Sequence, residues 1–366
     1  MYIKKLTLTN FKNHQLSSFQ FSEQVNCFVG DNGSGKTNIL DAIHYLSLTK
    51  SYFNKSDTDN IKFNEEYFIV KGDIYKGGEQ FIIQCSLYNG QNKIIKYNGK
   101  KYKRFSDHIG EFPVVIISPT DINIILDGSE IRRRYLDSII SQYDIKYLRN
   151  LIDYKKVLKQ RNRLLKDFNE RQYFDKVSLD VYDDQLINIG TYIHDKRQEY
   201  INLIIHLFRE FYKNISGGTE QVNIKYLSDL QTNEFSNALE NSLEKDRRTQ
   251  YTNVGIHKDD IIFEMNSNPI KKFGSQGQQK SFLIALKLAK FHFLESQIGF
   301  KPILLLDDIF DKLDEKRVKS LLSYAKNGSF GQVFITDTNK KRTKNILSSS
   351  KIQSNIFKLD NGKVIK

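Results

Sequence analysis

The sequence predicts an α/β fold in which a helical domain is inserted into a mixed domain built from both ends of the chain. Three observations lead to this class. Residues 1–120 alternate short apolar runs with turns, residues 121–250 change to helical spacing, and residues 251–366 return to a mixed pattern. We expect the first and third ranges to form one head and the second to form the inserted domain.

The N-terminal range carries strand patterns around one helix. The segments with these patterns are residues 3–8, 25–29, 67–105 and 113–117. Within the third segment, Asn89-Gly90 and Asn98-Gly99 are hairpin turn sequences, so we expect an antiparallel meander there. The fourth segment is an uninterrupted apolar run, which is typical of a buried strand.

The middle range has the three- and four-residue apolar spacing of amphipathic helices. The spacing runs from Ile131 to Leu158 and again from Tyr182 to Phe211, which predicts two long helices that end at Gly217-Gly218. No heptad pattern lasts long enough to predict a long coiled-coil arm.

The C-terminal range combines helices and strands. The expected elements are a helix over residues 276–295, a strand over 303–306, a helix near 315–326 and a strand over 332–336.

The charge balance favours an anionic partner. Lys and Arg total 56 against 43 Asp and Glu, a net charge of +13, so nucleic acid, an acidic membrane surface and an acidic protein all qualify. Two cysteines, Cys27 and Cys85, are too few for a disulfide framework or a zinc cluster. With no signal-peptide core and no membrane-spanning run, we expect a soluble, cytoplasmic protein that has no membrane partner.

Residues 30–37 match the phosphate-loop pattern G-x-x-x-x-G-K-[ST], between an apolar strand and an amphipathic helix. The glycines let backbone N–H groups converge on an anion, Lys36 should reach the β- and γ-phosphates of ATP, and Thr37 should bind Mg²⁺. The alternative is a glycine-rich turn before a helix. The predicted nucleotide-binding residues here are Gly30, Asp31, Asn32, Gly33, Ser34, Gly35, Lys36, Thr37 and Asn38.

A second acidic site is expected where the apolar strand over residues 303–306 ends at Asp307 and Asp308. Two carboxylates at the end of a buried strand are costly unless a cation or protonation relieves them. We expect Asp307 to hold Mg²⁺ and Asp308 to orient or deprotonate the attacking water. Asp-Asp also starts many turns, which is the alternative.

A third motif, Ser275-Gln276-Gly277-Gln278-Gln279, precedes an amphipathic helix. A helix N-terminus with a small hydroxyl and a glycine is an anion site, and Ser275 is equally suited to cap the helix. Both interpretations can hold together.

The three motifs together resemble those of ABC ATPases, specifically the recombination and SMC group. In this resemblance Ser275, Gly277 and Gln278 form the signature that contacts the γ-phosphate bound by a partner subunit. The runs at residues 118–121, 128–137, 255–260 and 275–280 resemble successive signatures of the bacterial RecF family of DNA replication and repair proteins. The sequence departs from the family at Glu130 and Ile256, where Pro is usual, and at Lys258, where Arg is usual.

The resemblance implies an ABC-type phosphate-loop ATPase head with an antiparallel β subdomain. It also implies a homodimer that closes on two ATP molecules, hydrolyses them slowly and binds single-stranded, double-stranded or gapped DNA. RecO- and RecR-like partners, recombinase loading and a part in the SOS response are further implications. Residues 118–121 would occupy the place of the Q-loop and Leu313-Asp314 would cross the dimer interface. The switch histidine of many ABC ATPases is missing at residues 335–338, and Asp308 stands where transporters carry Glu.

Two other classes remain as alternatives. A transporter ATPase subunit is disfavoured by the long helical stretch between residues 37 and 275, and a nuclease-linked ATPase is disfavoured because no further acidic cluster is present.

Other basic and polar side chains have two interpretations. Arg132-Arg133-Arg134 and Lys12 could contact DNA, or could pair with acids and solvent within the fold. His257 with Asp259 and Asp260 could suggest a metal site, but a surface or interface turn is the preferred interpretation.

Overall fold

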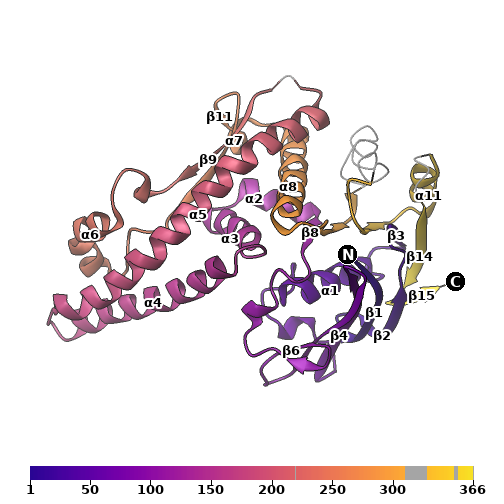
Figure 1. The fold of residues 1–366 in the computed structure, drawn as a ribbon, viewed down its shortest axis with the longest axis horizontal. Helices are drawn as coiled ribbons and strands as arrows, with labels where there is room; N and C mark the ends of the chain where they lie inside the picture. The colour runs from indigo at the N-terminus through magenta and orange to yellow at the C-terminus, as the bar shows by residue number, and fades with distance from the viewer. Residues whose placement is uncertain (219, 310–327, 350–352, 366) are drawn as a thin grey trace. The chain divides into compact units, whose positions relative to one another are not determined.

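The computed structural model describes residues 1–218, 220–309, 328–349 and 353–365 (Figure 1). They form two compact units, one from Met1–Asp121 with Phe282–Lys366 and one from Ile122–Ser281. The division differs from the expected one at its second boundary, because residues 251–281 pack with the helical unit and not with the head. The boundary falls inside helix α8 (Gln276–Ile298).

The first unit contains a six-stranded antiparallel sheet in the order β2-β1-β4-β5-β6-β7. Its strands are β1 (Tyr2–Phe11), β2 (His14–Gln20), β4 (Tyr67–Lys76), β5 (Glu79–Tyr88), β6 (Ile94–Tyr97) and β7 (Lys100–Lys101). The predicted meander is confirmed. At its last turn both Asn98 and Gly99 have positive φ, 47° and 80°, as a tight hairpin turn requires. The strand β2 has no counterpart among the predicted elements.

The second sheet of this unit is mixed, in the order β15-β14-β3-β13-β12-β8. Its strands are β3 (Val25–Val29), β8 (Val114–Ile117), β12 (Ile303–Leu306), β13 (Val333–Asp337), β14 (Ser354–Asp360) and β15 (Lys363–Ile365). Only the β14–β15 pair is antiparallel. The strands β3, β8, β12 and β13 are buried along their whole length, which explains the uninterrupted apolar sequences of β8 and β12 and the mainly apolar sequences of β3 and β13.

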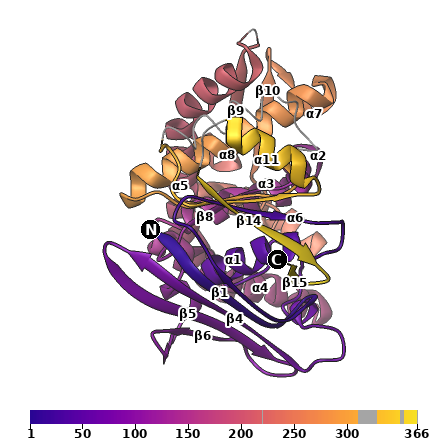
Figure 2. The same cartoon turned by 90° about the vertical axis from the view of Figure 1, so that its right-hand side faces the viewer.

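Helix α1 (Lys36–Leu48) lies between the two sheets and packs against β1, β4 and β5 on one side and β8 and β13 on the other (Figure 2). Every residue from position 39 to 49 is buried. Beside it, aromatic rings fill the core, with the Phe21 and Phe334 ring centroids 4.8 Å apart. Because α1 packs against both sheets, its N-terminus, where the phosphate loop ends, has a fixed position in the first unit.

The remaining short elements complete the two units. Helix α11 (Lys340–Ser349) belongs to the first unit. The single-turn 3₁₀ helices are η1 (Thr58–Asn60), η2 (Phe105–Asp107), η3 (Pro119–Ile122) and η4 (Asp229–Gln231). The helix that we expected near residues 315–326, and the residues Leu313-Asp314, lie outside the described part of the chain.

The second unit is mainly helical. Its helices are α2 (Asn123–Leu126), α3 (Ser129–Ile140), α4 (Ile145–Glu170), α5 (Lys176–Ser216), α6 (Phe235–Thr249) and α7 (Ile270–Phe273). Its strands β9 (Val222–Leu227), β10 (Asp260–Met265) and β11 (Asn268–Pro269) form a small antiparallel sheet in the order β11-β10-β9. The long helices α4 and α5 lie side by side (Figure 1).

The prediction of the first long helix is wrong in one respect. The structure has two helices, α3 and α4, where the apolar spacing predicted one. The Asp144 side chain accepts a hydrogen bond of 2.8 Å from the Tyr147 backbone N–H and so caps a new helix. The apolar spacing continues across the break, so periodicity alone did not reveal it. The predicted end of the second helix is confirmed, since Gly217 closes α5 in the left-handed conformation with φ 89°.

Two buried arginines tie the second unit together. Arg161, which has no exposed surface, contacts Asp183 of α5 at 2.5 Å and Asp246 of α6 at 2.7 Å. Arg197 contacts Asp137 at 2.9 Å and Asp259 at 2.8 Å. Since an unpaired buried charge is strongly destabilising, these pairs fix the way the helices pack.

Candidate functional site

The loop over residues 30–37 joins β3 to α1. Gly35 stands at the N-cap of α1 with φ 100°, a conformation that residues with a side chain rarely adopt. A Cβ atom on Gly30 would lie 2.4 Å from the carbonyl oxygen of Leu359, so that position also requires glycine. The loop therefore presents its backbone at a helix N-terminus, where an anion is favoured.

Lys36 places a positive charge inside this loop. Its ammonium group donates to the carbonyl oxygens of Gly30 and Asp31, each at 2.8 Å, and the residue is only 4% exposed. An ammonium group held in this way suits the phosphate role that the sequence predicts for it.

Asp307, at the end of β12, is surrounded by hydroxyl groups from three other segments. Thr37 donates to its Oδ1 at 2.8 Å, Thr336 donates to the same oxygen at 2.9 Å, and Ser118 donates to Oδ2 at 3.3 Å. Burial raises the pKa of the Asp307 carboxyl above its ordinary value, while the bonds from Thr37 and Thr336 act in the opposite direction.

This donor set fits Mg²⁺. A buried carboxylate beside the Thr37 hydroxyl provides the oxygen ligands that Mg²⁺ prefers. A cation would also relieve the cost of burying the Asp307 charge. The structure brings together the two residues that we predicted as metal ligands.

Asp308 follows with an unusual backbone. It has φ 44°, and its N–H donates to the Thr336 hydroxyl at 2.8 Å. Thr336 thus bridges Asp307 and the backbone of Asp308, in the segment where the switch histidine is missing. Sequence reasoning did not select Thr336. The role of Asp308 toward the attacking water stays a prediction.

The Ser275 motif forms a capped helix start in the second unit. The Ser275 hydroxyl accepts from the Gln278 N–H at 3.3 Å, and the Gln278 side chain accepts from the Ser275 N–H at 2.8 Å. This reciprocal pair is a capping box. Ser275 is exposed and Gly277 half-buried. The motif is therefore ordered by its own helix and open to contact, while the predicted contact with a partner's ATP stays a prediction.

A chain of polar contacts runs from Asp307 to the end of the first unit's N-terminal segment. Ser118, which contacts Asp307, donates its N–H to Asp121 at 2.7 Å. Asp121 also forms an ion pair of 2.6 Å with Lys287 of α8, and both residues are almost fully buried. Asp121 is the last residue before the chain enters the second unit, and α8 is the helix on which it returns.

His14 braces the phosphate loop, and sequence reasoning did not assign it this role. Its Nε2 lies 3.1 Å from the Gly35 carbonyl oxygen and its Nδ1 lies 2.9 Å from the Gly362 carbonyl oxygen. The Gly362 N–H in turn donates to the Ser34 carbonyl at 2.9 Å. Burial lowers the pKa of His14. The loop is thus tied to both β2 and the β14–β15 turn. The sequence signal was the polar run after the first strand, in which we had singled out Lys12.

Lys12 and the Arg132-Arg133-Arg134 run are largely occupied within the fold. Lys12 forms an ion pair of 2.5 Å with the buried Asp41. Arg132 contacts both carboxylate oxygens of Asp260, at 2.7 and 3.0 Å, and Arg133 donates to a backbone carbonyl at 2.6 Å. Only Arg134 is well exposed, and it pairs with Glu130 on its own helix. These contacts favour the interpretation in which the cations pair within the fold.

His257 is a half-buried structural residue. Its Nδ1 lies 3.1 Å from the Tyr154 hydroxyl and its Nε2 lies 3.0 Å from the Thr252 carbonyl oxygen. Burial lowers its pKa to about 4. No group of three or more His, Cys, Asp or Glu side chains in the described residues could hold a metal ion. The turn interpretation is the one that the contacts favour. Among all the residues that the structure describes, no helix is both long enough and apolar enough to cross a bilayer.

These features define an ABC-type ATPase head of the SMC kind. A phosphate loop and a buried acidic strand end lie together in an α/β unit, and a capped Ser-x-Gly helix start lies in an inserted helical unit. The family model described as RecF/RecN/SMC N terminal domain matches residues 2–361. The head of an Smc protein from Pyrococcus furiosus, in complex with a ScpA domain, shares the fold with a TM-score of 0.55 at 20% identity, over 100% of this chain and 96% of that one.

The chain belongs to the RecF family. It is 50% identical to the DNA replication and repair protein RecF of Flavobacterium johnsoniae over 98% of this chain and 100% of that protein. It is 43% identical to RecF of Phocaeicola vulgatus over 100% and 98% of the two chains. A solved structure described as the recombination mediator protein RecF with ATP, in the RecFOR pathway, matches with a TM-score of 0.89 at 34% identity, over 100% of this chain and 99% of that one.

Proposed function

We propose that this chain is an ATP-dependent DNA-binding protein of recombinational repair and replication, which closes as a homodimer on two ATP molecules. The observation that carries the proposal is the Asp307 cluster, in which hydroxyls of the phosphate loop and of Ser118 meet one buried carboxylate. ATP binding at this cluster would therefore change the hydrogen bond between Asp307 and Ser118, which lies shortly before the chain enters the second unit. The solved relative that is described with ATP supports nucleotide binding.

Each predicted site residue has its own role in binding and hydrolysing ATP. The loop N–H groups and Lys36 would bind the phosphates, and Thr37 with Asp307 would hold Mg²⁺, which neutralises charge on the β- and γ-phosphates. Asp308 would orient the attacking water. Ser275 and Gly277 of a second copy would complete the site from across the dimer. Asp308 has a shorter side chain than the Glu of transporters, which suits slow hydrolysis that acts as a switch.

A conformational change caused by ATP binding would reach the second unit through the two segments where the chain passes from one unit to the other. Ser118 and Asp121 lie at the first crossing, and Lys287 lies on α8, which contains the second. Because Asp121 and Lys287 form a buried ion pair, a shift at Ser118 would move both crossings together. The Ser275 motif at the start of α8 would then be reoriented by the same shift.

The DNA role rests on charge and on the relatives. A net charge of +13 favours phosphate contacts. A dimer would join two weak DNA sites by proximity. The solved relative is described as a recombination mediator in the RecFOR pathway, which is consistent with RecO- and RecR-like partners. We further propose recombinase loading onto single strands at gaps, a part in the SOS response and a location in the cytoplasm, which the resemblance to the RecF family implies.

The test is fluorescence anisotropy with duplex, single-stranded and gapped DNA, in ATP, ADP and no nucleotide, over a salt series. We expect tight binding with ATP at low salt and weak binding with ADP. Contacts with about six phosphates would cost roughly a thousandfold in affinity between 50 and 200 mM salt. Lys36→Ala should remove the ATP effect and keep the ADP-level affinity. Equal affinity in all nucleotide states would refute the switch, and no binding at low salt would favour the transporter-like alternative.

A further inference from the structure

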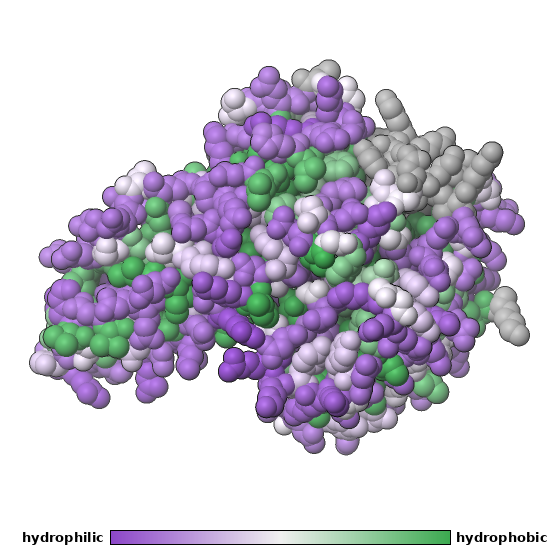
Figure 3. All heavy atoms as spheres, in the orientation of Figure 1, coloured by the Kyte–Doolittle hydropathy of each residue, from purple (hydrophilic) through white to green (hydrophobic). Residues whose placement is uncertain are grey.

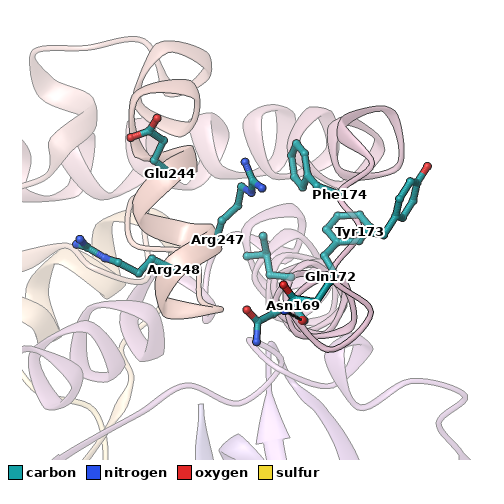
Figure 4. Close-up of a pocket in the computed structure, with 9 residues that line it drawn as sticks. Asn169, Gln172, Tyr173, Phe174, Glu244, Arg247 and Arg248 are labelled. Atoms are coloured by element: carbon teal, nitrogen blue, oxygen red, sulfur yellow. Dashed lines mark hydrogen bonds between the residues drawn. The ribbon is translucent and has the colours of Figure 1, made fainter.

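A pocket of about 400 Å³ lies at the end of the second unit where α4 passes into α5 (Figure 4). Its size falls within the roughly 300–1,000 Å³ of ordinary ligand sites. The lining combines aromatic and cationic side chains from the end of α4, the connecting loop and the end of α6. The lining residues include Phe168, Tyr173, Phe174, Glu244, Arg247 and Arg248.

The cations of this pocket are available to a ligand. The Arg247 guanidinium lies 4.1 Å from the centre of the Phe174 ring, and Figure 4 shows it pointing toward that ring. Arg247 and Arg248 are both exposed, and within the described chain neither forms an ion pair. The acidic lining residue, Glu244, points away from Phe174 (Figure 4). A planar guanidinium against a ring is a surface on which a further flat group can stack.

Two tyrosine rings are exposed at this end of the unit, one in the pocket lining and one outside it. Tyr173, in the loop between α4 and α5, is 64% exposed, and Tyr251, just after α6, is 51% exposed. Lys166 of α4 lies 4.9 Å from the centre of the Tyr251 ring. Exposed tyrosines beside cations can stack on bases whose phosphates the cations bind.

The positive charge continues along α4. Lys155 and Lys159 are exposed and lie four residues apart, and Lys166 follows seven residues later. With a rise of 1.5 Å per residue, the row is roughly 16 Å long. A row of cations that ends at exposed rings suits a flexible anionic chain with flat side groups.

We propose that this end of the second unit, defined by Tyr173, Arg247, Arg248 and Tyr251, binds single-stranded DNA. Bases would stack on the tyrosines and phosphates would contact the arginines and the α4 row. Duplex DNA keeps its base faces inside its own stack, so it could use only the cations. This site is one place where single-stranded DNA would bind, so the inference rests on the proposed function. Binding at this site requires neither ATP nor closure of a dimer.

The test measures anisotropy of labelled oligothymidylate with the full chain and no nucleotide. Tyr173→Ala should weaken binding about tenfold, within the range for loss of one stacked base, while Tyr173→Phe should bind like wild type. Arg247→Ala should reduce the slope of log affinity against log salt by about 0.7, the value for one lost phosphate contact on a single strand. Tyr173→Ala should leave that slope unchanged.

Matched controls separate this site from general charge and from the ATP switch. Lys245→Ala removes an exposed cation from the same helix, outside the pocket lining, and should not change binding. The affinity for duplex DNA, measured in each nucleotide state, should be the same in Tyr173→Ala as in wild type. Thermal melting checks that each variant is folded.

Three results would overturn the proposal: unchanged oligothymidylate affinity in Tyr173→Ala, equal losses in Lys245→Ala and Arg247→Ala, or a weakened Tyr173→Phe. This end of the unit also exposes Val177 and Val181, at 75% and 57%, and Figure 3 shows apolar residues among the hydrophilic ones where α4 and α5 meet. Unchanged affinity in Tyr173→Ala would therefore point to a protein contact there instead.

Discussion

Replacing Thr336 with valine removes one hydroxyl from the centre of the Asp307 cluster and leaves the side-chain shape almost unchanged. The hydroxyl donates to Asp307 at 2.9 Å and accepts from the Asp308 N–H at 2.8 Å, and Thr336 is fully buried. Each buried partner left without its bond costs about 1–3 kcal/mol. Since Thr37 still donates to the same Asp307 oxygen, we expect Thr336→Val to lower the free energy of unfolding by about 2–4 kcal/mol.

Calorimetry of the nucleotide-free protein measures this effect. For a unit of this size, each kcal/mol shifts the melting temperature by roughly 2–4 °C, so a fall of about 4–16 °C is expected. Loss of a group that orients a metal ligand typically costs 10–100-fold in metal affinity, so the Mg²⁺ concentration needed for ATP binding should rise about tenfold. Thr336→Ser keeps the hydroxyl and should behave like wild type. A valine variant with unchanged melting and unchanged Mg²⁺ dependence would refute the assignment of Thr336 as a support of Asp307.

Four further substitutions test other parts of the site. His14→Ala removes the brace from the phosphate loop and should weaken ATP binding about tenfold by calorimetry, whereas the exposed His206→Ala should not; equal affinities would contradict the brace. Ser275→Arg should keep ATP binding but abolish ATP-dependent dimerisation in light scattering, while Asp308→Asn should accumulate the ATP dimer; a Ser275→Arg protein that dimerises normally would disprove the signature assignment. Asp307→Asn should raise the melting temperature without nucleotide at neutral pH, because a raised pKa means that folding disfavours the ionised carboxylate. That gain should decline as the pH falls toward the unfolded value of 3.8, and a lower melting temperature at neutral pH would argue against it.

The fold could be predicted where local pattern and final environment agree. Buried strands such as β3 and β12 have apolar sequences, and the hairpin turn at Asn98-Gly99 has residues that accept positive φ. The break between α3 and α4 could not be predicted, because Tyr147 continues the apolar spacing and only the cap by Asp144 marks a new helix. The strands β9 to β11 were not predicted either. Their short sheet is stabilised by packing against α5 and against α3, which is distant in the sequence, and not by a local pattern.

The sequence by itself determined the phosphate loop and the position of Asp307, because each is built from contiguous residues whose types dictate their conformation. Only the tertiary structure decided which groups meet that carboxylate. Thr37 lies 270 positions from Asp307 and Ser118 lies 189 positions away. They converge because the order β3-β13-β12-β8 places the ends of parallel strands along one edge of the sheet. That order is set by burial over the whole unit, which no local stretch of sequence encodes.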